Sequence, residues 1–194
     1  MRHQSEIKKD ETGFTLVEMI VTCCIMGILA AIAIPGFSSL MPNYRLRLAA
    51  QELLSNFQLA KITAIKRSTN CTITFSVPSS NKYVINNDDA VYVVYVDTNR
   101  NLKYDTGEQI IAKKRWADYN NNVSFDINQV PGLGIGNSLT PNVDDLPSLS
   151  FRSNGMPVDK DGKISGGSVF LISTKKKSMY VNISKAGSVS IVSP

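Results

Sequence analysis

The first third of the chain carries two successive helical patterns. Residues 14–34 form an almost unbroken apolar run in which Glu18 is the only charged side chain. At about 1.5 Å per residue, a helix of this run is roughly 31 Å long, which is enough to cross the hydrocarbon core of a membrane. The pattern therefore predicts a transmembrane helix over residues 14–34.

A second, amphipathic helix is predicted over residues 43–67. Its apolar positions recur at spacings of three and four residues, which places them on one stripe of a helix. They are Leu46, Ala49, Ala50, Leu53, Phe57, Ala60 and Ala64. Such a stripe indicates a helix packed on its own domain. Between the two helices, Pro35, Gly36 and Pro42 predict a kink or a local loosening, because proline removes a backbone hydrogen bond and clashes with the preceding turn.

The pattern changes to a period of two after the second helix. Residues 71–77 alternate between apolar and polar side chains, which is typical of a strand. Further strand candidates are residues 91–96, 122–127, 149–152, 168–173, 179–183 and 188–192. Residues 131–147 are rich in glycine and proline and predict a loop. A long N-terminal helix followed only by strands predicts an α+β fold, with the helix laid across an antiparallel sheet.

Charge gives the chain an orientation in the membrane. The 194 residues suit one soluble domain with an appendage, and the formal net charge is +5. Arg2, Lys8 and Lys9 precede the apolar run, so residues 1–13 are expected in the cytoplasm and the rest of the chain outside it. The positive excess is modest and does not by itself argue for an anionic partner.

Cysteine and histidine usage excludes several kinds of site. Cys23 and Cys24 fall in the membrane run, and Cys71 stands alone beyond it, so no disulfide can form within the soluble domain. Cys71 is expected in the core. The only histidine is His3, so a chain without residues 1–13 has no serine–histidine or cysteine–histidine catalysis and no histidine-ligated zinc. With no phosphate-binding loop or nucleophile elbow either, the sequence predicts a protein that is not an enzyme.

The apolar run has alternative explanations. Ala30, Ala31 and Ala33 can mimic the cleavage site of a secretory signal peptide, although the run is longer than such peptides usually are. A lipoprotein signal ending at Cys23 fits poorly, since no small residue precedes that cysteine. A plain membrane anchor is the main alternative.

Glu18 separates these explanations. A carboxylate inside a membrane helix costs about 2.5–3.5 kcal/mol, and a plain anchor gains nothing from it. Cleavage after Gly13 would create a new amine on Phe14, one helical turn before Glu18. In a stacked assembly, the amine of one subunit can meet the Glu18 of its neighbour.

The stretch Gly13-Phe14-Thr15-Leu16-Val17-Glu18 resembles the class III signal of type IV pilins and type II secretion pseudopilins. The resemblance implies that a prepilin peptidase cuts after Gly13 and that the new N-terminal Phe14 is methylated. It also assigns Glu18 to subunit assembly and makes Pro35 the proline that softens the helix in the filament.

Later segments resemble the GspH/FimT branch of this family, namely residues 59–67, residues 96–101 with Gly107 and Glu108, and residues 151–155 with the final hairpin. The implied organisation is a cleaved leader (1–13), a transmembrane helix (14–34), an amphipathic helix continuing into the head (35–68) and a β-rich head (69–194). The implied location is the bacterial inner membrane, with a single pass and the head on the periplasmic side, before incorporation into a filament. The implied partners are prepilin peptidase, other pilin or pseudopilin subunits, an inner-membrane assembly platform and membrane lipid.

One loop has the spacing of a calcium site. Asp97, Asn99, Asn101, Asp105 and Glu108 fall at relative positions 1, 3, 5, 9 and 12, which is the oxygen-ligand spacing of an EF-hand loop. Leu102 stands where that loop needs glycine, and strands rather than helices flank the segment. A solvated hairpin turn is therefore the alternative to a calcium site. No other cofactor is predicted.

A basic run gives a second candidate site. Lys175, Lys176 and Lys177 lie between two predicted strands, where such runs usually form solvated turns. Some relatives in this branch bind DNA through arginines after a glycine in the last hairpin. The comparable residues 187–190 contain no arginine, which weakens that expectation.

The sequence thus favours a minor pilin or pseudopilin subunit of a type IV pilus or a type II secretion pseudopilus. The alternative is an adaptor at the pilus tip whose head binds DNA, as in natural transformation, or an exported substrate.

Overall fold

The computed structural model describes residues 13–77, 81–85, 88–126 and 139–193. The chain divides into two compact units, Met1–Leu40 and Met41–Pro194. Each unit is considered by itself. The division falls between Gly36 and Pro42, in the segment where the sequence predicts loosening.

Helix α1 spans Leu16–Arg67 without a break in its secondary structure. Pro35, Gly36 and Pro42 therefore lie inside the helix and do not end it, while a kink or loosening at these residues stays a prediction. Each proline removes a single donor, and the backbone on both sides keeps helical geometry. The stripe predicted for the second half is confirmed, since all seven of its members are buried: Leu46, Ala49, Ala50, Leu53, Phe57, Ala60 and Ala64.

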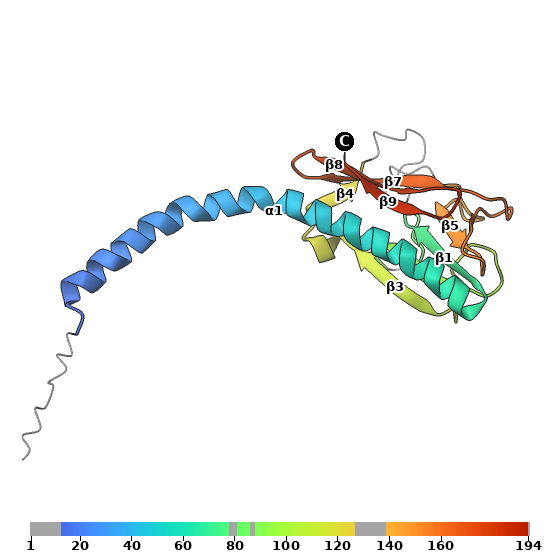
Figure 1. The fold of residues 1–194 in the computed structure, drawn as a ribbon, viewed down its shortest axis with the longest axis horizontal. Coiled ribbons are helices and arrows are strands. Elements are labelled where there is room, and N and C mark those ends of the chain that lie inside the picture. The colour runs from blue at the N-terminus through green and yellow to red at the C-terminus, as the bar shows by residue number, and fades with distance from the viewer. Residues whose placement is uncertain (1–12, 78–80, 86–87, 127–138, 194) are drawn as a thin grey trace, which may run out of the picture. The chain divides into compact units, whose positions relative to one another are not determined.

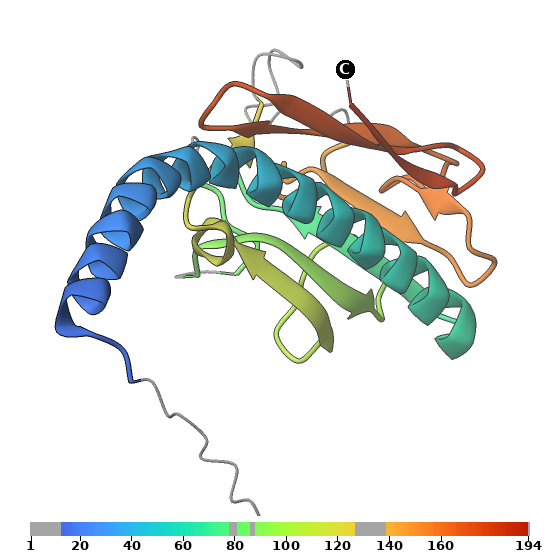
Figure 2. The ribbon, with the colours of Figure 1, turned by 60° about the vertical axis from the view of Figure 1, so that its left-hand side comes forward.

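The second unit contains two antiparallel sheets where the sequence predicted one (Figures 1 and 2). The first has the order β3-β2-β1-β5-β6 and the second the order β4-β7-β8-β9. Their strands are β1 (Asn70–Phe75), β2 (Ala90–Asp97), β3 (Ile110–Arg115), β4 (Val123–Phe125), β5 (Ser148–Phe151), β6 (Pro157–Val158), β7 (Gly167–Ser173), β8 (Ser178–Ile183) and β9 (Val189–Val192). The α+β class is confirmed, and every predicted strand segment overlaps a strand, although residue 127 at the end of one segment lies outside the described residues.

An aromatic chain joins the helix to both sheets. Phe57 of α1 lies 6.3 Å from Phe75 of β1, measured between ring centroids, and Phe75 lies 5.8 Å from Phe125 of β4. Phe57 and Phe75 are fully buried. The helix stripe therefore packs on one core that both sheets share.

Strand β3 and the short 3-10 helix Trp116–Tyr119 were not predicted. Strand β3 is the outermost strand of its sheet, and its side chains remain partly exposed. An edge strand of this kind can carry charged residues without apolar alternation, as in Lys113-Lys114-Arg115. Its charges are paired instead: Lys113 and Arg115 contact Asp88, and Lys114 contacts Glu52 of α1. Ion pairs of this kind leave no periodic hydrophobic signal.

The polar positions of β1 are buried as well as the apolar ones. Thr72 and Thr74 have no exposed surface, nor do Ser148 and Ser150 of the neighbouring strand β5. The hydroxyl of Ser148 donates to Thr74 at 2.9 Å, and the hydroxyl oxygens of Thr72 and Ser150 share a hydrogen bond at 2.8 Å. Thus the face of this sheet away from α1 is a hydroxyl-lined layer covered by the loops described below.

Cys71 lies in the core, as the sequence predicted. It has no exposed surface, and burial raises the pKa of its thiol to about 12. The thiol therefore stays protonated at neutral pH, where thiolate chemistry would need the deprotonated form.

Truncation of the central aromatic residue tests the shared core. Phe57→Ala is expected to lower the free energy of unfolding by about 3–5 kcal/mol, because it removes a fully buried ring and leaves a cavity. Urea denaturation of the full chain in detergent, followed through Trp116 fluorescence, measures the change. The matched control is Ile62→Ala on the exposed side of the same helix, which should cost less than about 1 kcal/mol. Equal losses in both variants would contradict this description of the core.

Candidate functional site

The N-terminal motif lies at the start of α1. Gly13, Phe14 and Thr15 precede the first helical residue, and no atom outside the neighbouring residues lies within 4 Å of the position of a Cβ added at Gly13. Phe14 is 79% exposed. The bond between Gly13 and Phe14 is thus outside the helix, and the Phe14 side chain next to it is exposed.

Thr15 caps the helix, a role that sequence reasoning missed. Its side-chain oxygen accepts a hydrogen bond from the Glu18 backbone N–H at 3.2 Å, and its carbonyl accepts one from Met19. The signal was present in the sequence, since threonine followed three residues later by glutamate is a known helix-start pattern. The cap fixes the helix start two residues after the Gly13–Phe14 bond.

Glu18 stands in the first turn of a helix that suits a membrane. Residues Leu16–Ile34 have a mean hydropathy of 2.5, and none of these residues is buried within the molecule. This is the single described helix long and apolar enough to cross a membrane. Within the described part of the chain, the carboxylate of Glu18 has no side-chain partner. Its neighbour Thr22 bonds the Glu18 carbonyl instead.

The five predicted calcium ligands lie in one loop between β2 and β3. Asp97 is fully buried and acts as the anchor of the loop. Its carboxylate accepts hydrogen bonds from the backbone N–H groups of Asn101 at 3.2 Å and Leu102 at 3.0 Å, and from the Thr72 hydroxyl at 3.0 Å. Leu102 has a φ of 58°, so the left-handed conformation of a glycine position is present without glycine.

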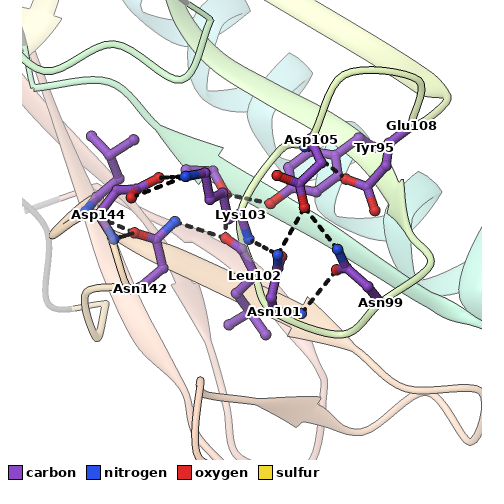
Figure 3. A network of polar contacts seen from close by, with 11 residues as sticks. Tyr95, Asn99, Asn101, Leu102, Lys103, Asp105, Glu108, Asn142 and Asp144 are labelled. Atoms are coloured by element: carbon purple, nitrogen blue, oxygen red, sulfur yellow. Dashed lines mark hydrogen bonds and ion pairs between the residues drawn. The ribbon is translucent and has the colours of Figure 1, made fainter.

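The remaining oxygens also take part in the loop (Figure 3). Asp105 accepts from the amide groups of Asn99 at 2.7 Å and Asn101 at 2.8 Å, and these hydrogen bonds lower its pKa. Glu108 accepts from the backbone N–H groups of Thr98 and Asp105. Every predicted ligand is therefore engaged in a hydrogen bond of the loop.

This arrangement does not present a formed metal site. The described residues contain no group of three or more histidine, cysteine, aspartate or glutamate side chains placed to hold a metal. Asn99 and Asn101 direct their N–H groups at Asp105, so both amides would have to rotate before their oxygens faced a cation. Calcium binding stays a prediction that a rise in melting temperature on adding calcium would support.

The buried leucine of the loop closes the hydroxyl-lined layer of the first sheet. The Leu102 carbonyl accepts hydrogen bonds from Asn142 at 2.7 Å and Thr74 at 3.4 Å, and Lys103 pairs with Asp144 (Figure 3). The loop after β2 and the segment before β5 thus form a joined cover. Its evident role is structural.

The predicted basic run is the tip of the β7–β8 hairpin. Lys175, Lys176 and Lys177 are all exposed, and Lys176 occupies the left-handed position of the turn with a φ of 60°. The six ion pairs found among the described residues include none of these lysines. They form an unneutralised positive tip.

The last hairpin turn is held against the helix. Lys61 of α1 donates a hydrogen bond to the Gly187 carbonyl at 2.8 Å. Gly187 has a φ of 76°, and a Cβ added there would lie 2.7 Å from the Gly155 carbonyl oxygen. Residues 187–190 thus contain no arginine, and Gly187 is packed against the helix and Gly155 while Ser188 and Ser190 are exposed.

Comparison with known proteins identifies the family. Residues 49–187 match the model of the type II transport protein GspH, and residues 8–34 match the prokaryotic N-terminal methylation motif. The first match covers most of the chain. The chain belongs to the GspH family of pseudopilins. It is accordingly a minor pilin or pseudopilin of the type II secretion and type IV pilus class, and a structural subunit rather than an enzyme.

The chain is also similar to solved structures and to one curated protein. The minor pseudopilin EpsH from the type 2 secretion system of Vibrio cholerae shares the fold, with a TM-score of 0.50 at 12% identity over 77% of this chain and 98% of that one. The type IV minor pilin FimU of Pseudomonas aeruginosa gives a TM-score of 0.45 at 14% identity over 77% of this chain and 90% of that one. The pilin-like protein PilA1 of Thermus thermophilus is 32% identical over 102 residues, which are 52% of this chain. The chain spans 57% of that relative's length.

Removal of the loop anchor tests the account of the β2–β3 loop. Asp97→Ala is expected to lower the free energy of unfolding by about 3 kcal/mol, because it leaves buried donors of Leu102 and Thr72 without an acceptor. Asp105→Ala, in the same loop but partly exposed, should cost clearly less. Urea denaturation in the presence of a chelator measures both. An Asp97→Ala variant as stable as Asp105→Ala would show that the buried carboxylate does not hold the loop.

Proposed function

We propose that this subunit enters a filament through three groups of its N-terminal motif. Prepilin peptidase hydrolyses the bond after Gly13, the new amine of Phe14 is methylated, and the Glu18 carboxylate of one subunit pairs with that amine on a neighbour. The carrying observation is Glu18 itself, a charge in a membrane-spanning helix with no side-chain partner in the described chain.

The geometry at the start of α1 supports processing at this bond. The Gly13–Phe14 peptide is outside the helix, and the Thr15 cap prevents the helix from beginning earlier. A peptidase can therefore reach an extended segment without first unwinding a turn. Cleavage leaves the Gly13 carboxylate on the leader and the Phe14 amine on the mature chain.

Pro35 has a proposed part in the assembled state. The helix runs continuously through this position, but Pro35 cannot donate a backbone hydrogen bond. The segment around it is therefore the one most easily stretched when subunits pack together. In this proposal the free subunit keeps a regular helix, and loosening occurs on incorporation.

The proposed setting is the bacterial inner membrane. The chain crosses it once, with residues 1–13 in the cytoplasm and the head on the periplasmic side. Other pilin or pseudopilin subunits and an inner-membrane assembly platform then act on the inserted subunit. The positive residues of the leader support this orientation, and the exposed apolar side chains of Leu16–Ile34 support insertion.

Mass analysis of the mature N-terminus tests the processing step. The full chain, expressed in cells that contain prepilin peptidase, is expected to lack residues 1–13 and to carry one methyl group on the amine of Phe14. An intact leader, or cleavage near Ala33, would contradict the proposed cleavage after Gly13.

Substitution of Glu18 tests the assembly step. Glu18→Gln keeps the size of the side chain and removes the charge, so cleavage should continue while incorporation into filaments falls on the order of 100-fold. That magnitude corresponds to the cost of about 2.5–3.5 kcal/mol for an unpaired charge within a membrane. Quantitative immunoblotting of sheared filaments measures incorporation, with Thr22→Ser as the matched control. Normal incorporation of Glu18→Gln would count decisively against the pairing.

A further inference from the structure

The two turns of the C-terminal sheet lie at opposite ends of the head. Ser173, the last residue of β7, donates a side-chain hydrogen bond to Asn43 of α1 at 3.2 Å. At the other end of β8, Gly187 accepts its hydrogen bond from Lys61. Asn43 and Lys61 are separated along α1 by about 27 Å at 1.5 Å per residue. The β7–β8 turn with Lys175–Lys177 thus marks the end where α1 enters the head (Figures 1 and 2).

The covalent chain keeps this end of the head near a membrane. The apolar span ends at Ile34, and Asn43 follows it in the same continuous helix. A helix rises about 14 Å over that interval, and the headgroup layer occupies about 5–8 Å of it. The remainder is about one Debye length at physiological salt, over which charges still interact.

The same end carries positive charge without acidic neighbours in sequence. Residues 35–51 contain Arg45 and Arg47 but no aspartate or glutamate, and residues 173–178 contain three lysines and no acidic residue. Arg47 and the three lysines are exposed. The turn is also held in place, because Thr174 donates its N–H to the Asn122 carbonyl at 3.0 Å and Lys176 donates to Ser173 at 2.8 Å. The charges are therefore presented by a fixed turn.

We propose that Lys175, Lys176 and Lys177 dock the head on anionic phospholipid headgroups while the subunit waits in the membrane. Three lysines close to an anionic surface each strengthen binding by roughly fivefold, and the effect is lost at high salt. The docked head cannot rotate freely about its anchor. Incorporation into a filament then requires release of this contact. The inference rests on the proposed membrane insertion of residues 14–34.

Trp116 provides a natural probe of docking. It is the only tryptophan, and it packs against Phe125 with ring centroids 4.9 Å apart, so it moves with the head. Full-length chain is reconstituted into neutral phosphatidylcholine vesicles and into vesicles with about a third phosphatidylglycerol. The residual anisotropy of Trp116 is expected to be at least twofold higher in the anionic vesicles and to fall to the neutral value in high salt.

Two variants with equal charge loss locate the contact. Lys175→Gln/Lys176→Gln/Lys177→Gln should show the neutral value in anionic vesicles, whereas Lys160→Gln/Lys163→Gln/Lys185→Gln, also exposed, should retain the higher one. A native tryptophan emission spectrum confirms folding of each variant. Equal behaviour in the two vesicle types, or equal loss in both variants, would overturn the docking proposal.

Two further measurements distinguish lipid docking from a failure of membrane insertion and from DNA binding. Resistance of the chain to alkaline extraction reports membrane insertion, so failure there would overturn the proposed function itself rather than the lysine contact alone. Double-stranded DNA added to chain in neutral vesicles tests the other anionic partner. If DNA slows the head through the same three lysines, and anionic lipid does not, the tip is a nucleic-acid contact and the lipid proposal is wrong.

Discussion

Packing of the apolar stripe of α1 against both sheets is the interaction on which the head depends. The stripe ends in small residues, Ala60 and Ala64, and has Phe57 near its centre, so the helix approaches the strands closely around one large ring. Both sheets contribute buried side chains to the core that this stripe covers. Because the same helix continues into the apolar span, the element that organises the head is also the element that anchors it.

The face of the first sheet away from α1 buries polar side chains. Its threonine and serine hydroxyls are satisfied by one another, by Asp97 and by the loop carbonyl of Leu102. Buried polar groups are tolerated only when their hydrogen bonds are complete. The acidic and amide side chains after β2 meet that need by folding the loop over the sheet. Acidic and amide residues at the spacing of a cation-binding loop can therefore have a structural role, which here is to cover a buried face of the sheet.

Periodicity predicted the parts of the fold that bury apolar surface. The stripe from Leu46 to Ala64 and the strands around Val94, Val169 and Val181 follow directly from alternation or from three- and four-residue spacing. Strand β3 escaped prediction because it is an edge strand held by backbone pairing to β2, and its charged, ion-paired side chains leave no period in the sequence. The split into two sheets escaped because it depends on contacts between distant strands, which no local pattern encodes.

The N-terminal motif was readable because its chemistry is local: a glycine, an exposed amine position and one costly carboxylate within six residues. The position of the lysine tip was not readable, because it depends on the contact between Ser173 and Asn43, which are 130 residues apart. The sequence of a charged run does not show where the run lies on the folded molecule.

The contacts of the final hairpin also decide when the head can form. Lys61 meets Gly187 across 126 residues, and Val189 and Ile191 pack against the core that the helix begins. These contacts cannot form until the last strand is present, and long-range contacts of this kind form slowly. The native head is therefore complete only when nearly the whole chain is available to fold.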